Sequence, residues 1–80
     1  MNEKIDIDDG FSVSTFSGTA AYQGTTTRGV ANVEEYEVSI PALGLSGLVG
    51  EWDGDARHNV TVRYTGQVRR AMRRTRGVQS

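Results

Sequence analysis

Cysteine is absent from the 80-residue sequence, and proline, histidine and tryptophan occur once each. Without cysteine the chain has no disulfide, no thiolate nucleophile and no cysteine-ligated zinc or iron–sulfur site. Packing alone must therefore hold the fold. The length provides material for one core, because domains commonly run from about 50 to 250 residues. A chain of this size buries only about 60 per cent of the surface that its unfolded form exposes, so binding a partner would stabilise it further.

Long hydrophobic runs are missing as well. A membrane span needs about 18 consecutive apolar residues, and the longest weakly polar stretch, residues 40–50, is shorter and is broken by Pro41 and several glycines. The first residues turn acidic at once and lack the apolar run of a secretory signal. We therefore expect no membrane contact and an intracellular (cytoplasmic) or virion location.

Acidic and basic residues occupy different parts of the chain. Residues 1–68 contain four basic and ten acidic residues, a net charge of −6, whereas residues 69–76 contain five arginines and no acid. The whole chain has a formal net charge of −1. This asymmetry predicts a β-rich core domain over residues 1–68 and a basic C-terminal helix or tail over residues 69–80.

Alternation of apolar and polar residues predicts β-strands along most of the core. Alternation is clear over residues 3–8, 11–15, 35–40 and 58–68, of which the last is the longest run, and further strand candidates are residues 19–23, 30–33 and 48–52. Turn-forming residues separate most of these segments, such as Asp8-Asp9-Gly10 and Asp53-Gly54-Asp55. Ser17-Gly18 has the composition of a bulge or bend. The pattern favours antiparallel pairing, because each predicted strand is short and follows closely on the previous one.

Two segments lack alternation. Gly24–Gly29 is rich in threonine and bounded by glycines, so we interpret it as an exposed loop. Pro41 cannot donate to a strand ladder, so we interpret Ala42–Gly47 as a flexible connection.

From Val68 onward the apolar period changes to that of a helix, with Val68, Ala71, Met72 and Thr75 on one face. Gly77 fits the position just past the helix end. A helix of about ten residues is unstable alone in water, so it must dock, bind or fray. The predicted fold is mainly β: a small antiparallel barrel or two-layer sheet of five to seven short strands with a short C-terminal helix.

The arginines at the end of the chain are the strongest functional signal. Guanidinium groups pair with phosphate, so the cluster is one way to bind a nucleic acid, with counterion release supplying affinity. Arg63 and Tyr64 are candidate helpers, because aromatic rings beside basic residues stack on bases. The residues of this predicted site are Arg63, Tyr64, Arg69, Arg70, Arg73, Arg74 and Arg76. The acidic core argues against an extended nucleic-acid footprint, and a solvated helix face is the simplest alternative.

Opposite charge at the two ends of a small protein also favours contact between proteins, including head-to-tail contact between copies. The predicted acidic contact surface comprises Glu34, Glu35, Glu37, Glu51, Asp53 and Asp55. The leading hypothesis is a non-enzymatic protein-association module that self-assembles or binds a host or structural protein partner. Size and composition are in keeping with a phage or mobile-element protein. The alternative is a small nucleic-acid-binding protein that uses the C-terminal arginine cluster.

Catalytic and metal sites have little support in the sequence. His58 lies near Asp53 and Asp55, and these are residue types that bind divalent metals, but we interpret them as a turn followed by a strand-end histidine. No serine or threonine lies in a nucleophile motif. Trp52 and Tyr64 are interpreted as core residues. We therefore predict no enzymatic activity, no metal and no cofactor.

Overall fold

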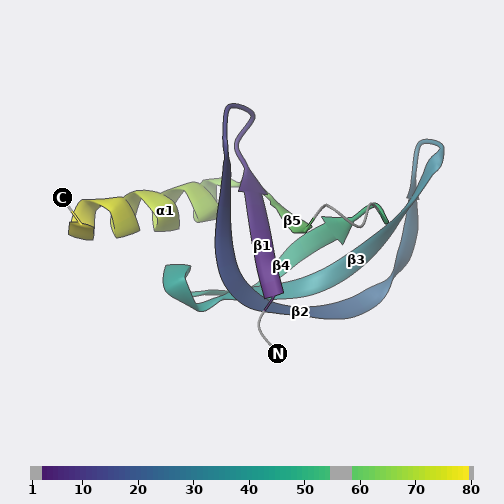
Figure 1. Ribbon diagram of the computed structural model, residues 1–80, viewed down its shortest axis with the longest axis horizontal. Coiled ribbons are helices and arrows are strands. Elements are labelled where there is room, and N and C mark those ends of the chain that lie inside the picture. The colour runs from purple at the N-terminus through teal and green to yellow at the C-terminus, as the bar shows by residue number, and fades with distance from the viewer. Residues whose placement is uncertain (1–2, 55–58, 80) are drawn as a thin grey trace.

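Five β-strands, a short 3-10 helix and one α-helix make up residues 3–54 and 59–79, which a computed structural model of the chain describes, with side chains as far as Thr75. The elements are β1 (Glu3–Asp8), β2 (Val13–Arg28), β3 (Ala31–Ile40), η1 (Pro41–Leu43), β4 (Leu45–Trp52), β5 (Val60–Arg63) and α1 (Gly66–Gln79). The strands form a closed barrel in sequence order, and α1 leads away from it (Figure 1). The predicted mainly β fold with a short C-terminal helix is confirmed, and of the two predicted architectures, barrel or two-layer sheet, the structure has the barrel.

The barrel closes through a parallel pair, β1 with β5. Each strand runs antiparallel to the one before it, so the first and fifth strands must run in the same direction. Ile5 lies opposite Val60, and Ile7 lies opposite Val62. Closure covers backbone edges that would otherwise be free to pair with other chains.

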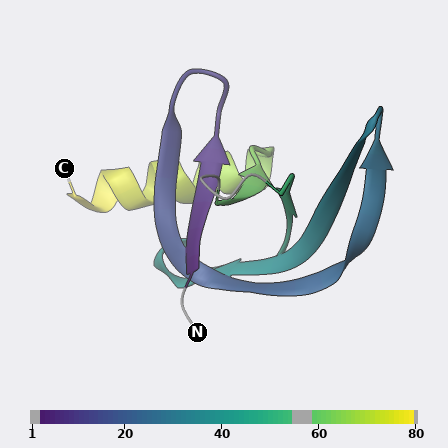
Figure 2. The same ribbon diagram turned by 45° about the vertical axis from the view of Figure 1, so that its right-hand side comes forward.

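β2 is long enough to serve two partners. Residues 13–18 pair with β1, and residues 19–28 pair with β3. The strand bends between these parts, and the β2–β3 hairpin reaches away from the barrel (Figure 2). Gly18 lies at this change of partner, where an added Cβ would collide with the backbone carbonyl oxygen of Ser39 and lie 3.1 Å from Cγ1 of Ile5. The predicted bend at Ser17-Gly18 is therefore a place where two strands approach closely.

The barrel interior is apolar, and no polar or charged residue in the described part of the chain is buried. Alternating side chains fill it as predicted: Ile5 and Ile7 from β1, Val38 and Ile40 from β3, and Val60 and Val62 from β5. The fold thus avoids the free-energy cost of desolvating polar groups, and the charged residues remain at the surface.

Gly24–Gly29, predicted to be an exposed loop, is instead the end of β2 and the start of a tight turn. The three threonines of this segment pair in register with β3, and β-branched threonine favours strands. A register shift between Tyr22 and Gly24 marks a β-bulge. The turn itself is Gly29-Val30, where Gly29 has a positive φ of 63°. Hydroxyl-rich composition misled the prediction because exposed strands share it with loops.

The predicted flexible connection at Ala42–Gly47 is also wrong. Pro41 begins η1, and the N–H of Gly44 donates a hydrogen bond of 2.9 Å to the Pro41 carbonyl oxygen. Leu43 and Leu45 are buried, so this connection contributes to the core. β4 accordingly begins at Leu45, ahead of the predicted start at residue 48.

β5 is shorter than the alternating pattern predicts, because the last residues of that pattern belong to a helix. β5 ends at Arg63, and α1 begins at Gly66. The N–H of Val68 donates to Oγ1 of Thr65 over 3.4 Å, so Thr65 caps the helix where the pattern predicted strand. α1 also continues through Gly77, which the sequence placed beyond the helix end.

Candidate functional site

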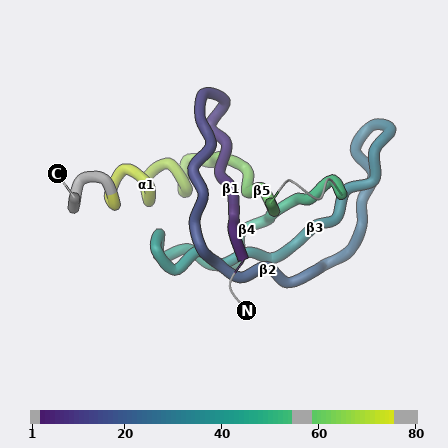
Figure 3. Tube along the Cα trace, viewed as in Figure 1, coloured from purple at the N-terminus to yellow at the C-terminus, as the bar shows by residue number. Residues whose placement is uncertain are grey.

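α1 packs against the barrel through an apolar stripe, and arginines are exposed to solvent on both sides of this stripe. Val68 and Ala71 are buried, and Met72 packs against the core. The helix arginines, as we call those whose side chains are described, are all exposed: Arg69, Arg70, Arg73 and Arg74. They form two pairs at i,i+4 spacing, one along each flank. Figure 3 shows that α1 runs away from the strands toward the C-terminus. The side chain of Arg76 lies outside the described part of the chain.

None of the helix arginines forms an ion pair with a carboxylate among the described side chains, where both ion pairs belong to Arg28 on β2. Pairing within the subunit would have removed the basis for binding through the cluster, because a guanidinium already bound to a carboxylate has less to offer another anion. The helix arginines are therefore available to a second molecule.

Tyr64 lies beside one flank of α1. It packs against the core, as the sequence predicts. It also lines a shallow cavity of about 200 Å³ with Asp9, Arg69, Met72 and Arg73. Arg63 lines a different hollow, of about 390 Å³. The structure thus brings Tyr64 to the helix arginines, and it places the neighbouring Arg63 on another part of the surface.

Arg28 holds together two like charges on neighbouring strands. Glu35 on β3 and Glu51 on β4 lie directly opposite each other, a placement that is repulsive on its own. Nη2 of Arg28 lies 2.6 Å from Oε2 of Glu51 and 3.7 Å from Oε2 of Glu35. The end of β2 thereby neutralises part of the predicted acidic surface. Sequence reasoning missed Arg28 because its contacts depend on strand register, and no local motif marks them.

Glu34 is engaged by a tyrosine on its own strand. The hydroxyl of Tyr36 donates to Oε1 of Glu34 over 2.5 Å. This hydrogen bond, together with burial and the nearby charge of Glu34, raises the pKa of Tyr36 to about 12. The ring of Tyr36 also meets the ring of Tyr22 edge to face, with centroids 5.7 Å apart. Glu34 thus belongs to an aromatic cluster on the β2–β3 ribbon.

Glu37 differs from its acidic neighbours. Among the described side chains of the predicted acidic surface, it alone has no hydrogen bond or ion pair. It lies opposite Val49, whose side chain is 59% exposed. Glu35, Glu37 and Val49 line a shallow hollow of about 290 Å³, together with Gln23, Tyr36, Gly47 and Leu48. We call the exposed surface formed by Glu35, Glu37, Val49 and Glu51 the β3–β4 face.

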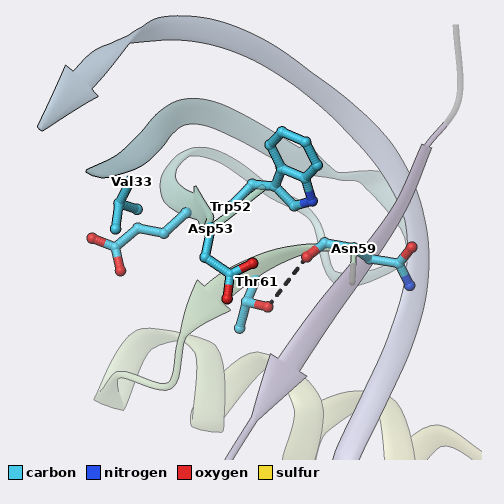
Figure 4. A pocket seen from close by; sticks show the side chains of 6 residues that line it. Val33, Trp52, Asp53, Asn59 and Thr61 are labelled. Atoms are coloured by element: carbon cyan, nitrogen blue, oxygen red, sulfur yellow. Dashed lines mark hydrogen bonds between the residues drawn. The ribbon is translucent and has the colours of Figure 1, made fainter. Parts of the chain in front are cut away.

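A further hollow, of about 200 Å³, is lined by Trp52 at the end of β4 (Figure 4). Its lining residues are Val33, Glu51, Trp52, Asp53, Asn59 and Thr61. The hydroxyl of Thr61 donates to the carbonyl oxygen of Asn59 over 3.4 Å. Trp52 is half-buried and packs against the core, as predicted, so its ring forms a wall of the hollow and also supports the barrel.

Asp55 and His58, which the sequence analysis considered with Asp53 as metal ligands, lie outside the described residues. Within residues 3–54 and 59–79, no group of three histidine, aspartate or glutamate side chains is placed to hold a metal ion. The interpretation of this segment as a turn stays a prediction.

Apolar side chains at two hairpin tips were not predicted as surface features. Phe11, between β1 and β2, is 98% exposed, and Val30, between β2 and β3, is fully exposed. Alternation treats apolar residues as core, so it cannot distinguish a residue that a turn projects into solvent. Both are sites where a partner can bury apolar area.

In the described part of the chain, no helix has the length and apolar character needed to cross a membrane. Comparison of the chain with protein-family models, curated proteins and solved structures gives no match.

Proposed function

We propose that the chain is a non-enzymatic protein-association module, which binds further copies of itself or a host or structural protein partner. Its contact surfaces are the helix arginines and the β3–β4 face. One observation carries the proposal: the helix arginines are exposed and have no carboxylate partner among the described side chains, in a chain whose net charge is −1. The cations and anions that remain unpaired within the subunit can pair between subunits.

Local electrostatics also favour an acidic partner for α1. Like charges at i,i+4 spacing repel along each flank of a helix. A carboxylate from another molecule relieves this repulsion and adds charge-assisted hydrogen bonds. Partner binding also stabilises a small fold by mass action. We further propose an intracellular or virion setting, which suits a chain without cysteine; fractionation of the native host would test it.

Light scattering over a range of protein and salt concentrations tests this proposal. We expect the average mass to rise with protein concentration at low salt and to fall as salt screens the charges. Affinity capture from the native host covers the case of a different protein partner. A strict monomer at high concentration and low salt, with no protein recovered by capture, would contradict the proposal.

Nucleic-acid binding is the second candidate, and the exposed helix arginines beside Tyr64 favour it. Phosphate contacts would make the affinity fall steeply with salt. A gel-shift series with the wild-type chain and a variant lacking the helix arginines decides the case. Loss of both affinity and salt slope in the variant supports this candidate, and absence of a wild-type shift at low salt rejects it.

A further inference from the structure

We propose that the helix arginines dock on the β3–β4 face of a second copy, with Arg70 and Arg74 of one chain on Glu35 and Glu37 of the next. The arginine stems then lie over Val49. This inference rests on the proposed function and goes further, because it names the partner and the two surfaces that meet.

Charge spacing matches on the two surfaces. Arg70 and Arg74 are one helical step of i,i+4 apart, about 6 Å along the axis of α1. Glu35 and Glu37 are alternate residues on one side of β3, about 6.8 Å apart along the strand. Two guanidinium groups on one helix flank can therefore each meet a carboxylate at the same time.

The β3–β4 face can accept these cations. Glu37 has no partner among the described side chains, and Glu35 lies 3.7 Å from the guanidinium of Arg28, whose closer contact is with Glu51. Val49 is 59% exposed and lines the same hollow as both glutamates. Arginine carries an apolar stem beneath its charge, so an acidic hollow with an apolar floor suits it better than a flat acidic surface would.

The two flanks of α1 are not equivalent, and this identifies the docking pair. Arg69 and Arg73 share a shallow cavity with Asp9 and Tyr64 of their own chain. Arg70 and Arg74 lie on the opposite flank of the same exposed helix. The first pair thus has a carboxylate of its own subunit nearby, and the second pair is the better donor to a neighbouring subunit.

Different surfaces meet in this contact, so the interface is heterologous. After one pairing, one chain retains an unused face and the other retains an unused Arg70 and Arg74 pair, so further copies can add until a ring closes or a filament forms. Because two different surfaces meet, a variant that lacks one surface should still pair with a variant that lacks the other.

The test uses two double variants of the full chain in sedimentation experiments at low salt. The face variant combines Glu35→Gln with Glu37→Gln, and the helix variant combines Arg70→Gln with Arg74→Gln. We expect each alone to associate at least about tenfold more weakly than wild type, a free-energy difference near 1.4 kcal/mol. The mixture should form a one-to-one dimer of the 8.7 kDa chains and stop there, because the face variant supplies an intact helix and the helix variant supplies an intact face.

A matched control combines Arg69→Gln with Arg73→Gln, which removes the same charge from the other flank; we expect it to assemble like wild type. Circular dichroism checks that every variant is folded. Equal weakening by the helix variant and the control, or no dimer in the mixture, would overturn the inference. The proposed function would still stand in that case if the wild-type chain assembles. A wild-type chain that stays monomeric overturns the inference, and the proposed function then fails as well if no protein partner is captured.

Discussion

Charged side chains on the barrel and on α1 differ in whether they contact other side chains of the same subunit. On the barrel, Arg28 binds Glu51, and Glu34 accepts a hydrogen bond from Tyr36. On α1, the helix arginines have no such partner among the described side chains. Charge at these barrel positions contributes to the fold, whereas charge on the helix, like that of Glu37 on β3, is free for contact with another molecule.

Gly18→Ala should have the largest effect. The added methyl group meets the backbone carbonyl of Ser39, which cannot move away as a flexible side chain can. We expect a loss of about 3 kcal/mol in the free energy of unfolding, at the upper end for overpacking. Urea unfolding followed by tryptophan fluorescence measures it. Gly66→Ala is the matched control in α1, where the closest atom is a guanidinium nitrogen of Arg70 at 3.4 Å; it should be neutral or stabilising. Equal losses at both glycines would contradict the contrast.

Val68→Ala tests whether the barrel and the helix form one cooperative unit. Val68 is fully buried where α1 docks, and removing its methyl groups should cost about 2 kcal/mol. Far-UV circular dichroism reports the helix, and fluorescence of Trp52 reports the barrel. We expect the two urea transitions to shift together. A helix signal lost well before the fluorescence signal would show that α1 is held independently of the barrel.

Arg28→Gln and Arg74→Gln compare charge on the two regions directly. Removing Arg28 leaves Glu35 opposite Glu51 without a bridging cation, and the expected loss is about 0.5–1 kcal/mol, as these side chains are partly exposed. Removing Arg74 should change the free energy of unfolding by less than about 0.5 kcal/mol. Urea unfolding at low salt and at about 1 M salt should show the Arg28 effect shrinking as screening increases. A larger loss for Arg74→Gln would refute the proposed division of charge.

Alkaline titration reports on a single side chain of the barrel, Tyr36. Its pKa is about 12 in the folded chain, against 10.0 ordinarily, so the folded state holds this proton more tightly than the unfolded state. The resulting stabilisation is complete below pH 10 and is lost as the pH rises through 12. Ultraviolet titration should show a late phenol component at a pH of about 12, and Tyr36→Phe should remove that component. Persistence of the late component in the variant would assign it to another tyrosine.

The alternating strands show how much of the fold is predictable from sequence. The pattern predicts the burial of Ile5, Ile7, Val60 and Val62, because side chains alternate along a strand and one face of each strand points into the barrel interior. The pattern does not predict the strand formed by the threonines before Gly29, because an exposed strand rich in hydroxyl residues has the composition of a loop. The alternating pattern continues past Thr65, although the helix begins there. The pattern does not reveal the helix because Val68 is an apolar residue that packs in either structure.

The sequence predicts which residues form the candidate surfaces, but it does not predict which of them contact one another. The charge count identifies the basic helix, and four of its arginines are exposed as expected. No pattern in the sequence places Arg28 beside Glu51 or sets Glu35 against Glu51, because these contacts arise from register between three strands. The sequence therefore identifies the acidic residues, and the fold determines which of them, Glu37 above all, stays unpartnered.

Parallel pairing of β1 with β5 imposes an order on how the protein is made. The first strand waits for its second neighbour until residues 60–63 have been synthesised, since Ile5 pairs with Val60. Contacts this distant in sequence form slowly, because a large loop must be closed first. Until then one side of the nascent first strand is an open template for other chains. Completion of β5 thus closes the barrel and covers the edge of β1 that was open until then.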